Sequence, residues 1–357
     1  MNKNENTCLF RKVVMFMRKF LGLIAGFIFI LSATLMAGCG TSSNTGQQSA
    51  DGVKTLKVGF GSSIEKSSGG KGLQKFKEEV EKNSNGKIKV ELYGDGQLGN
   101  DKSMMEALQM GTLDMTLPSS SPVAEFNKSF LAFDLPFLFT TNEQVDKVLD
   151  GKNGKEILAT LDSTNLHGLC FFENGFRNLT NSKQPITSVA DLKGLKIRTM
   201  QNPIMLETFK LWGANPVPMA FNEVFTALEQ KTIDGQENPN TLIYDSAFYE
   251  VNKYITISHH FYTPYVLIIS KKTWDSLSKD DQKLIQDAAD TAKVYQRQVN
   301  RQLDSEYLQK MKDNGAQVNE LSPEAIAQMK DMAKPVYEKF AGDIGQDRLN
   351  AILDELK

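Results

Sequence analysis

The chain has 357 residues, which is long enough for two domains. With 40% hydrophobic and 24% charged residues, its composition is that of a globular protein rather than of a disordered or fibrous one. A formal net charge of −2, with no long basic run, argues against a nucleic-acid-binding protein.

The N-terminal segment differs in composition from the rest of the chain. Basic residues precede an apolar run over 20–37, and Ala37-Gly38-Cys39 follows it. Small residues before a cysteine resemble a bacterial lipoprotein signal, so we expect residues 1–38 to be a signal peptide and Cys39 to carry a lipid. An uncleaved membrane anchor is the alternative, because the apolar run is near spanning length. Residues 39–52 are polar and predict a flexible, lipid-anchored linker.

The first half of the remaining chain alternates strands and helices. Alternating or apolar runs predict strands over 56–60, 87–92, 113–117 and 166–172, and helical spacing predicts helices over 69–82, 101–110, 142–150 and 153–162. The order of the elements over 56–117 implies parallel pairing with right-handed crossovers. The apolar run over 130–139 is short and broken by proline, so it is interpreted as core. Cys170 lies in an apolar strand and is predicted to be a buried, inert thiol.

A second lobe is expected to begin near 173–176. The predicted elements there are a helix over 203–211, a strand over 216–218, a helix from Phe221, and a helix capped by Asn238 with Pro239 in its first turn. Runs of β-branched residues over 251–258 and 265–270 are interpreted as strands that return to the first lobe. A long helix over 278–313, about 50 Å at 1.5 Å per residue, is placed across both lobes. Helices over 323–340 and 345–356 close the chain.

Arg198 stands in a strand-like run, where its side chain shares a face with Lys196 and not with Ile197. A guanidinium matches a carboxylate in two parallel hydrogen bonds, so Arg198 is a candidate for binding an anionic small molecule. The alternatives are a solvated arginine and one paired with an internal carboxylate.

Several sequence words resemble the substrate-binding proteins of tripartite ATP-independent periplasmic (TRAP) transporters, the DctP family. They are Gly-Phe-Arg-x-Leu-Thr (175–180), Asp-Leu-Lys-Gly-Leu-Lys-Ile-Arg (191–198), Pro-Met-Ala-Phe-Asn-Glu-Val-Phe (218–225), Asp-Gly-Gln-Glu-Asn-Pro (234–239) and, upstream, Gly-Gln-Leu-Gly (96–99). The resemblance covers roughly residues 54–350. It implies an α/β, two-lobed, periplasmic-binding-protein-like clamshell with a hinge. We expect lobe I at 53–174 and 264–303, and lobe II at 175–263 and 304–357.

The resemblance also implies which residues hold the ligand. Arg198 matches the family's carboxylate-binding arginine, Arg177 a second arginine, and Asn238 an asparagine at the same end of the ligand. Phe221 matches an aromatic contact and Gln201 a polar one. His260 and Tyr262 match a region near the hinge. Phe221, Gln201 and His260 each have a purely structural alternative, and Asn238 has one as a helix cap.

The first lobe departs from the sialic-acid members of the family. Those members have a carboxylate after the third strand, where this chain has Pro118-Ser119-Ser120-Ser121. Ser119 is therefore a candidate for contacting hydroxyl groups, and Glu65 is a weaker candidate. A sugar acid such as a hexuronate or aldonate is favoured, and a C4-dicarboxylate is the alternative.

The resemblance implies an extracytoplasmic receptor that delivers an organic acid to the small and large membrane subunits of a TRAP permease. A sensor that signals to a kinase partner is a second possibility. An enzyme is not expected, because the sequence has no nucleophile elbow, nucleotide loop or metal-ligand spacing. No cofactor and no metal are expected.

Overall fold

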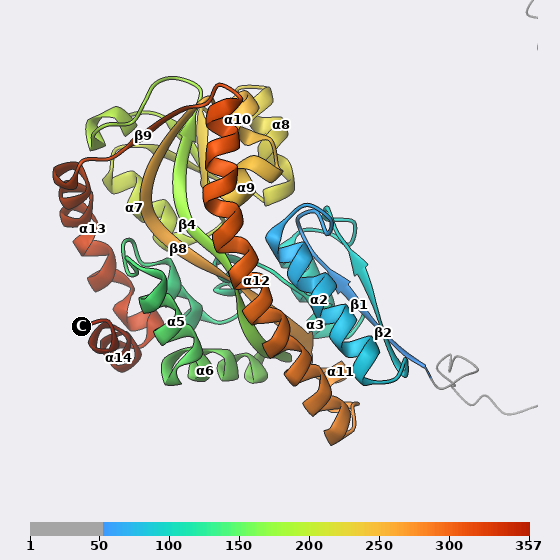
Figure 1. Cartoon of the computed structure of the whole chain (residues 1–357). Helices are drawn as coiled ribbons and strands as arrows, with labels where there is room; N and C mark the ends of the chain where they lie inside the picture. Colours follow the sequence, from blue (N-terminus) through green and yellow to red (C-terminus); the bar gives the residue numbers. More distant parts are fainter. Residues whose placement is uncertain (1–52) are drawn as a thin grey trace, which may run out of the picture. The chain divides into compact units, whose positions relative to one another are not determined.

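A mixed sheet organises the described part of the chain, residues 53–357 of the computed structural model (Figure 1). The predicted signal peptide and linker (1–52) lie outside the described residues. The strands are β1 (Lys54–Gly59), β2 (Ile88–Tyr93), β3 (Met115–Thr116), β4 (Leu166–Asn181), β5 (Lys196–Thr199), β6 (Asn215–Pro218), β7 (Gly235–Asn238), β8 (Tyr254–Ser270) and β9 (Gln317–Glu320). They pair in the order β2-β1-β3-β8-β4-β7-β5-β6, and β9 joins β8.

Helices connect and cover these strands. The α-helices are α2 (Ser68–Asn83), α3 (Asp101–Met110), α4 (Ser120–Val123), α5 (Asn142–Asp150), α6 (Lys152–Ala159), α7 (Pro203–Leu211), α8 (Val224–Glu229), α9 (Asn240–Asp245), α10 (Phe248–Val251), α11 (Lys271–Asp275), α12 (Lys279–Asp313), α13 (Pro323–Ile344) and α14 (Gln346–Glu355). Short 3-10 helices are η1 (Lys128–Asp134), η2 (Thr160–Thr164), η3 (Val189–Leu192) and η4 (Phe221–Glu223).

The sheet contains two groups of parallel strands. β1 pairs in parallel with β2 and β3, which confirms the parallel pairing predicted for the first lobe. β5 pairs in parallel with β6 and β7. Between the two groups, β8 and β4 run antiparallel to each other, β8 runs antiparallel to β3, and β4 runs antiparallel to β7. The two groups correspond to the two lobes of an α/β clamshell.

β4 and β8 are longer than the sequence predicted. The strand expected to end at 172 continues to Asn181, and the strands expected over 251–258 and 265–270 form one strand of 17 residues. Register shifts interrupt this pair, one of them between Glu173 and Gly175. Gly175 has a φ of 125°, a conformation that side-chain-bearing residues rarely adopt. The predicted boundaries were wrong because bulges break the alternation without ending the pairing.

Asn238 ends β7 instead of capping a helix, so that prediction was also wrong. Its Cα is paired with that of Asn178 on β4, and α9 begins two residues later. The residue at the N-cap of α9 is Pro239, which makes no side-chain capping bond. Strand pairing competes here with the local capping preference, and the pairing prevails.

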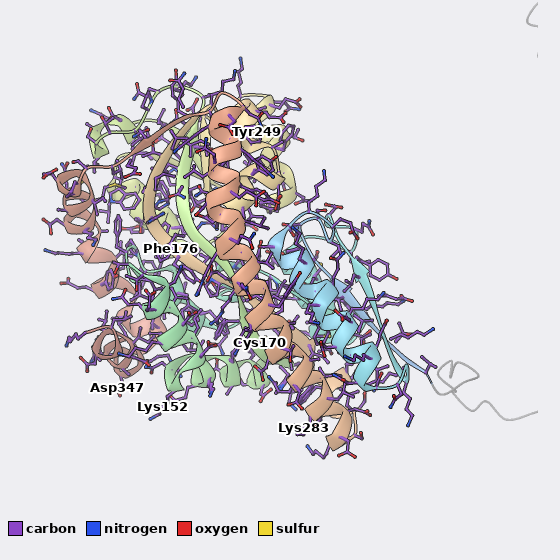
Figure 2. All side chains as sticks on the ribbon, viewed as in Figure 1. Lys152, Cys170, Phe176, Tyr249, Lys283 and Asp347 are labelled. Atoms are coloured by element: carbon purple, nitrogen blue, oxygen red, sulfur yellow. The ribbon has the colours of Figure 1, made fainter. Side chains whose placement is uncertain are left out.

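The predicted long helix is confirmed as α12, with 35 residues. The Ser278 side chain caps it by accepting from the Asp281 N–H. α12 packs against α2, β4 and α9 (Figure 1). α2 connects β1 and β2 of the first parallel group, and α9 follows β7 of the second, so α12 contacts helices on both sides of the sheet's central pair. Cys170, labelled beside α12 in Figure 2, is buried as predicted, and burial raises the pKa of its thiol. The apolar run over 130–139 contributes to the core through Phe130, Phe133 and Phe139.

Candidate ligand-binding site

One pocket lies where the carboxyl ends of both parallel groups meet. From the first group, the segments after β1, β2 and β3 contribute Phe60, Gly61, Ser62, Gly96, Gly99, Asn100, Asp101, Lys102, Leu117, Ser119 and Pro122. From the second group, β5, β6 and β7 and the segments that follow them contribute Arg198, Met200, Gln201, Met219, Ala220, Phe221, Asn222, Asn238 and Leu242. The long central strands supply Asn174, Arg177 and Tyr265. Ligands of open α/β sheets bind outside such carboxyl ends.

Arg198 reaches the pocket from β5 with part of its guanidinium unoccupied. Its Nε and Nη2 donate to the Met219 carbonyl at 3.1 and 2.8 Å. Within residues 53–357, its buried Nη1 has no hydrogen-bond partner. Burial lowers the pKa of Arg198 to about 10, so the group stays charged at neutral pH. A buried cation with a free donor is costly unless an anion binds it.

Arg177 is held by the protein itself. Its Nη2 donates to Glu237 Oε1 at 2.8 Å and to Asn238 Oδ1 at 2.9 Å, and its Nη1 donates to Thr263 Oγ1 at 3.2 Å. The side chains of Arg177 and Glu237 are both fully buried. Although burial opposes ionisation, the Arg177 guanidinium keeps the pKa of Glu237 below its usual range. Arg177 therefore gives the pocket a neutralised pair rather than a free cation.

The first-lobe wall carries a carboxylate that the sequence reasoning did not single out. Asp101 begins α3, directly after the loop that follows β2, and lines the pocket. Burial raises its pKa to about 6, although the Ser119 backbone N–H and the charge of Arg198 oppose that rise. The signal for Asp101 was its place at the start of a predicted helix, two residues after the 96–99 motif ends.

Two more polar groups face the pocket. Ser119 is 5% exposed, and its Oγ has no hydrogen-bond partner in the described part of the chain. The same holds for Oδ1 of Asn174, a second residue that sequence reasoning missed. Asn174 lies at the register shift of β4, beside Gly175. Only the pairing of β4 with β8 reveals that shift.

The structure brings six of the nine predicted substrate-binding residues into this pocket: Arg198, Arg177, Asn238, Phe221, Gln201 and Ser119. His260 is fully buried outside the lining, with Nδ1 2.7 Å from Ser258 Oγ and Nε2 3.5 Å from Glu237 Oε2. Tyr262 is also buried outside the lining. Glu65 lines a separate surface hollow with Ser63 and Ile64.

Two lobes that present a pocket with buried arginines between the carboxyl ends of their parallel strands are typical of a periplasmic-type solute-binding protein. A family model described as bacterial extracellular solute-binding protein, family 7 (DctP) matches residues 62–343. The chain belongs to this family, whose members are solute-binding receptors of TRAP transporters and not enzymes. In residues 53–357, no helix is long and apolar enough to cross a membrane.

Similar proteins have different ligands. The 2,3-diketo-L-gulonate-binding periplasmic protein YiaO of Escherichia coli is 36% identical over 287 residues, or 80% of this chain and 87% of that protein. The sugar acid binding protein DctPAm of Advenella mimigardefordensis, solved with galactonate, is 41% identical with a TM-score of 0.83, covering 85% and 98% of the two chains. A TRAP solute-binding protein of Sulfurospirillum deleyianum with bound succinate is 31% identical with a TM-score of 0.80, covering 84% and 98%.

Proposed function

We propose that this protein is an extracytoplasmic receptor that captures an organic acid by its carboxylate and delivers it to the membrane subunits of a TRAP permease. The observation that carries the proposal is the buried Nη1 of Arg198, which has no partner within residues 53–357. A ligand carboxylate at this end of the guanidinium would receive hydrogen bonds and neutralise the charge. Arg177 and Asn238 would shape the same end of the pocket from β4 and β7.

We further propose that the ligand is a sugar acid, such as an aldonate or hexuronate. The side of the pocket formed by the first lobe carries three polar groups. They are the Ser119 hydroxyl, the Tyr265 hydroxyl, which is hydrogen-bonded to Ser62, and the Asp101 carboxylate. The lysine on that wall, Lys102, is already paired with Glu125 at 2.7 Å. Such a wall suits hydroxyl groups better than a second carboxylate. The galactonate complex of the similar Advenella protein agrees with this preference.

A C4-dicarboxylate is the alternative ligand, because the similar Sulfurospirillum protein was solved with succinate. A sensor that passes the signal to a kinase partner remains the alternative role. Ligand binding does not separate a permease receptor from a sensor. Uptake of the labelled acid by cells with and without the permease genes separates them.

Closure of two lobes around the ligand is part of the proposal. Lobe I would comprise 53–174 and 264–303, and lobe II would comprise 175–263 and 304–357. The bulge between Glu173 and Gly175 lies at the first of these boundaries, which supports a hinge there. α14 packs against α5 and α6, so the C-terminal helix contacts elements of proposed lobe I as well.

Membrane attachment would come from a lipid on Cys39 after removal of residues 1–38. This proposal rests on the sequence pattern alone. Metabolic labelling with a fatty acid should mark the wild-type protein and not Cys39→Ala. Equal labelling of both would contradict acylation at Cys39.

A thermal-shift screen tests the binding function. The chain from residue 53 would be unfolded, dialysed and refolded to remove any bound ligand, then mixed with aldonates, hexuronates, C4-dicarboxylates, 2-oxo acids and sialic acid. A ligand that binds only the folded state raises the melting temperature. A shift with a sugar acid supports both proposals, and a shift with succinate alone overturns the ligand preference. If none of the carboxylates raises the melting temperature, the proposal that the protein captures an organic acid through Arg198 is overturned.

A further inference from the structure

Three buried polar atoms that line the pocket lack a hydrogen-bond partner within residues 53–357. They are Arg198 Nη1 from β5, Ser119 Oγ after β3, and Asn174 Oδ1 from β4. Buried polar atoms in native proteins are nearly always paired, so the unpaired atoms describe the ligand that completes the site. The three atoms differ in whether they donate or accept a hydrogen bond. This difference determines which functional groups the ligand must carry.

Arg198 Nη1 can only donate, and a carboxylate satisfies it. Asn174 Oδ1 can only accept. An ionised carboxylate has no hydrogen to give, so the group that binds Arg198 cannot also satisfy Asn174. The ligand therefore needs an O–H or N–H donor in addition to its carboxylate. Ser119 Oγ both donates and accepts, so it does not discriminate between these groups.

Hydrogen bonds hold the Asn174 amide beside the guanidinium of Arg177. Asn174 Nδ2 donates to Thr263 Oγ1 at 3.4 Å, and the same oxygen accepts from Arg177 Nη1 at 3.2 Å. The Asn174 carbonyl accepts from Asn300 Nδ2 of α12 at 3.4 Å, which fixes the backbone. The amide thus lies beside Arg177, whose charge acts on Arg198, and we place the ligand donor near the ligand carboxylate on this basis.

The charge near this amide favours a hydroxyl over an ammonium group. Among residues 53–357, Arg198 forms no ion pair, whereas Arg177 at the same end of the pocket is neutralised by Glu237. An ammonium group placed beside the Arg198 guanidinium would meet like charge. A neutral hydroxyl provides the donor without that cost.

We propose that Asn174 is a specificity-determining residue that accepts a hydrogen bond from a hydroxyl on the carbon next to the ligand carboxylate. This inference rests on the proposed function, and it narrows the ligand from organic acids in general to 2-hydroxy acids. Succinate and simple 2-deoxy acids would leave the amide oxygen unpaired, so they bind more weakly.

The test compares ligands that differ only at this hydroxyl. Isothermal titration calorimetry would measure the refolded chain from residue 53 with D-galactonate and its 2-deoxy analogue, and with D-glycerate and 3-hydroxypropionate. Leaving a buried acceptor unpaired costs enough to predict a preference of roughly tenfold or more for each 2-hydroxy acid. In Asn174→Ala the preference should fall to about threefold or less, because the acceptor is gone.

Asn252→Ala is the matched control, since Asn252 is a buried, hydrogen-bonded asparagine outside the pocket lining. It should keep the wild-type preference. Equal binding of both members of each pair by the wild type would overturn the inference, and this holds even if Asn174→Ala fails to fold. A preference that survives in folded Asn174→Ala, or tighter binding of the matching 2-amino acid, would overturn it as well. Binding of succinate without either 2-hydroxy acid overturns this inference and the sugar-acid preference but leaves the receptor role, whereas no binding of any carboxylate overturns the receptor role itself.

Discussion

At the scale of single residues, the two pocket arginines differ in their partners. Arg177 is saturated by Glu237, Asn238 and Thr263, whereas Arg198 keeps Nη1 free among residues 53–357. Both arginines are buried, so exposure does not separate their roles. The unpaired donor separates them, and it makes Arg198 the residue on which anion affinity should depend most.

We expect Arg198→Lys to lose most of the affinity for the ligand. A lysine ammonium cannot bond both the Met219 carbonyl and a carboxylate in the planar geometry of a guanidinium. Loss of one charge-assisted hydrogen bond costs about 1.5–3 kcal/mol, which is roughly tenfold or more in the dissociation constant. Calorimetric titration measures it. Arg348→Lys, at an arginine outside the pocket lining, is the control; wild-type affinity in Arg198→Lys would refute the carboxylate fork.

Asp101 should make binding depend on pH. Its pKa is raised to about 6, and a bound anion nearby would raise it further, so binding takes up a proton. By linkage, affinity should increase as the pH falls from about 8 to about 5, by about tenfold for each unit by which the ligand raises the pKa. The measurement is a titration series over this range with wild type and Asp101→Asn. The difference between the two profiles isolates Asp101, and identical profiles would contradict the prediction.

At the scale of secondary-structure elements, the buried Arg177–Glu237 pair joins β4 to β7. Arg177→Ala would leave the Glu237 carboxylate buried and unpaired, and breaking a buried pair costs about 3–5 kcal/mol. We therefore expect a large fall in the free energy of unfolding, measured by urea denaturation. The double variant Arg177→Met/Glu237→Leu should recover much of the loss, because no charge is left unpaired. A single variant as stable as wild type would show that the pair does not hold these strands.

At the scale of the whole described chain, α12 anchors the boundary between the proposed lobes. Gln296 binds the backbone of Glu173 on both sides, its Oε1 accepting from the N–H at 2.8 Å and its Nε2 donating to the carbonyl at 2.7 Å. Asn300 Oδ1 accepts from Ser68 Oγ at 2.6 Å, which ties α12 to the start of α2. These bonds attach the backbone at the bulge to α12.

We expect the ligand to close the lobes. Small-angle scattering from the refolded chain beginning at residue 53 should show a smaller radius of gyration with a saturating ligand than without it, because the ligand has more partners in the closed state. Arg198→Lys at the same ligand concentration should show a smaller change. An unchanged radius for wild type at saturation would contradict hinge closure.

The sequence alone determined the features that depend on local pattern. Periodicity predicted α3, α7 and α12 nearly to the residue, since each has a clear apolar face and a start signal. The sequence words from 175 to 239 identified the family and led to Arg198, because these words are continuous in the chain.

The tertiary structure decided whatever depends on partners distant in sequence. The lengths of β4 and β8, and the role of Asn238 as a strand end, follow from pairing across more than fifty residues. The difference between Arg177 and Arg198 also comes from tertiary partners, because Glu237 on β7 and the Met219 carbonyl, which follows β6, reach them from other parts of the chain. Asp101 and Asn174 join the pocket because the sheet brings strand ends together. Local propensity depends only on residues that are near in sequence, so residue type and spacing alone did not predict these contacts.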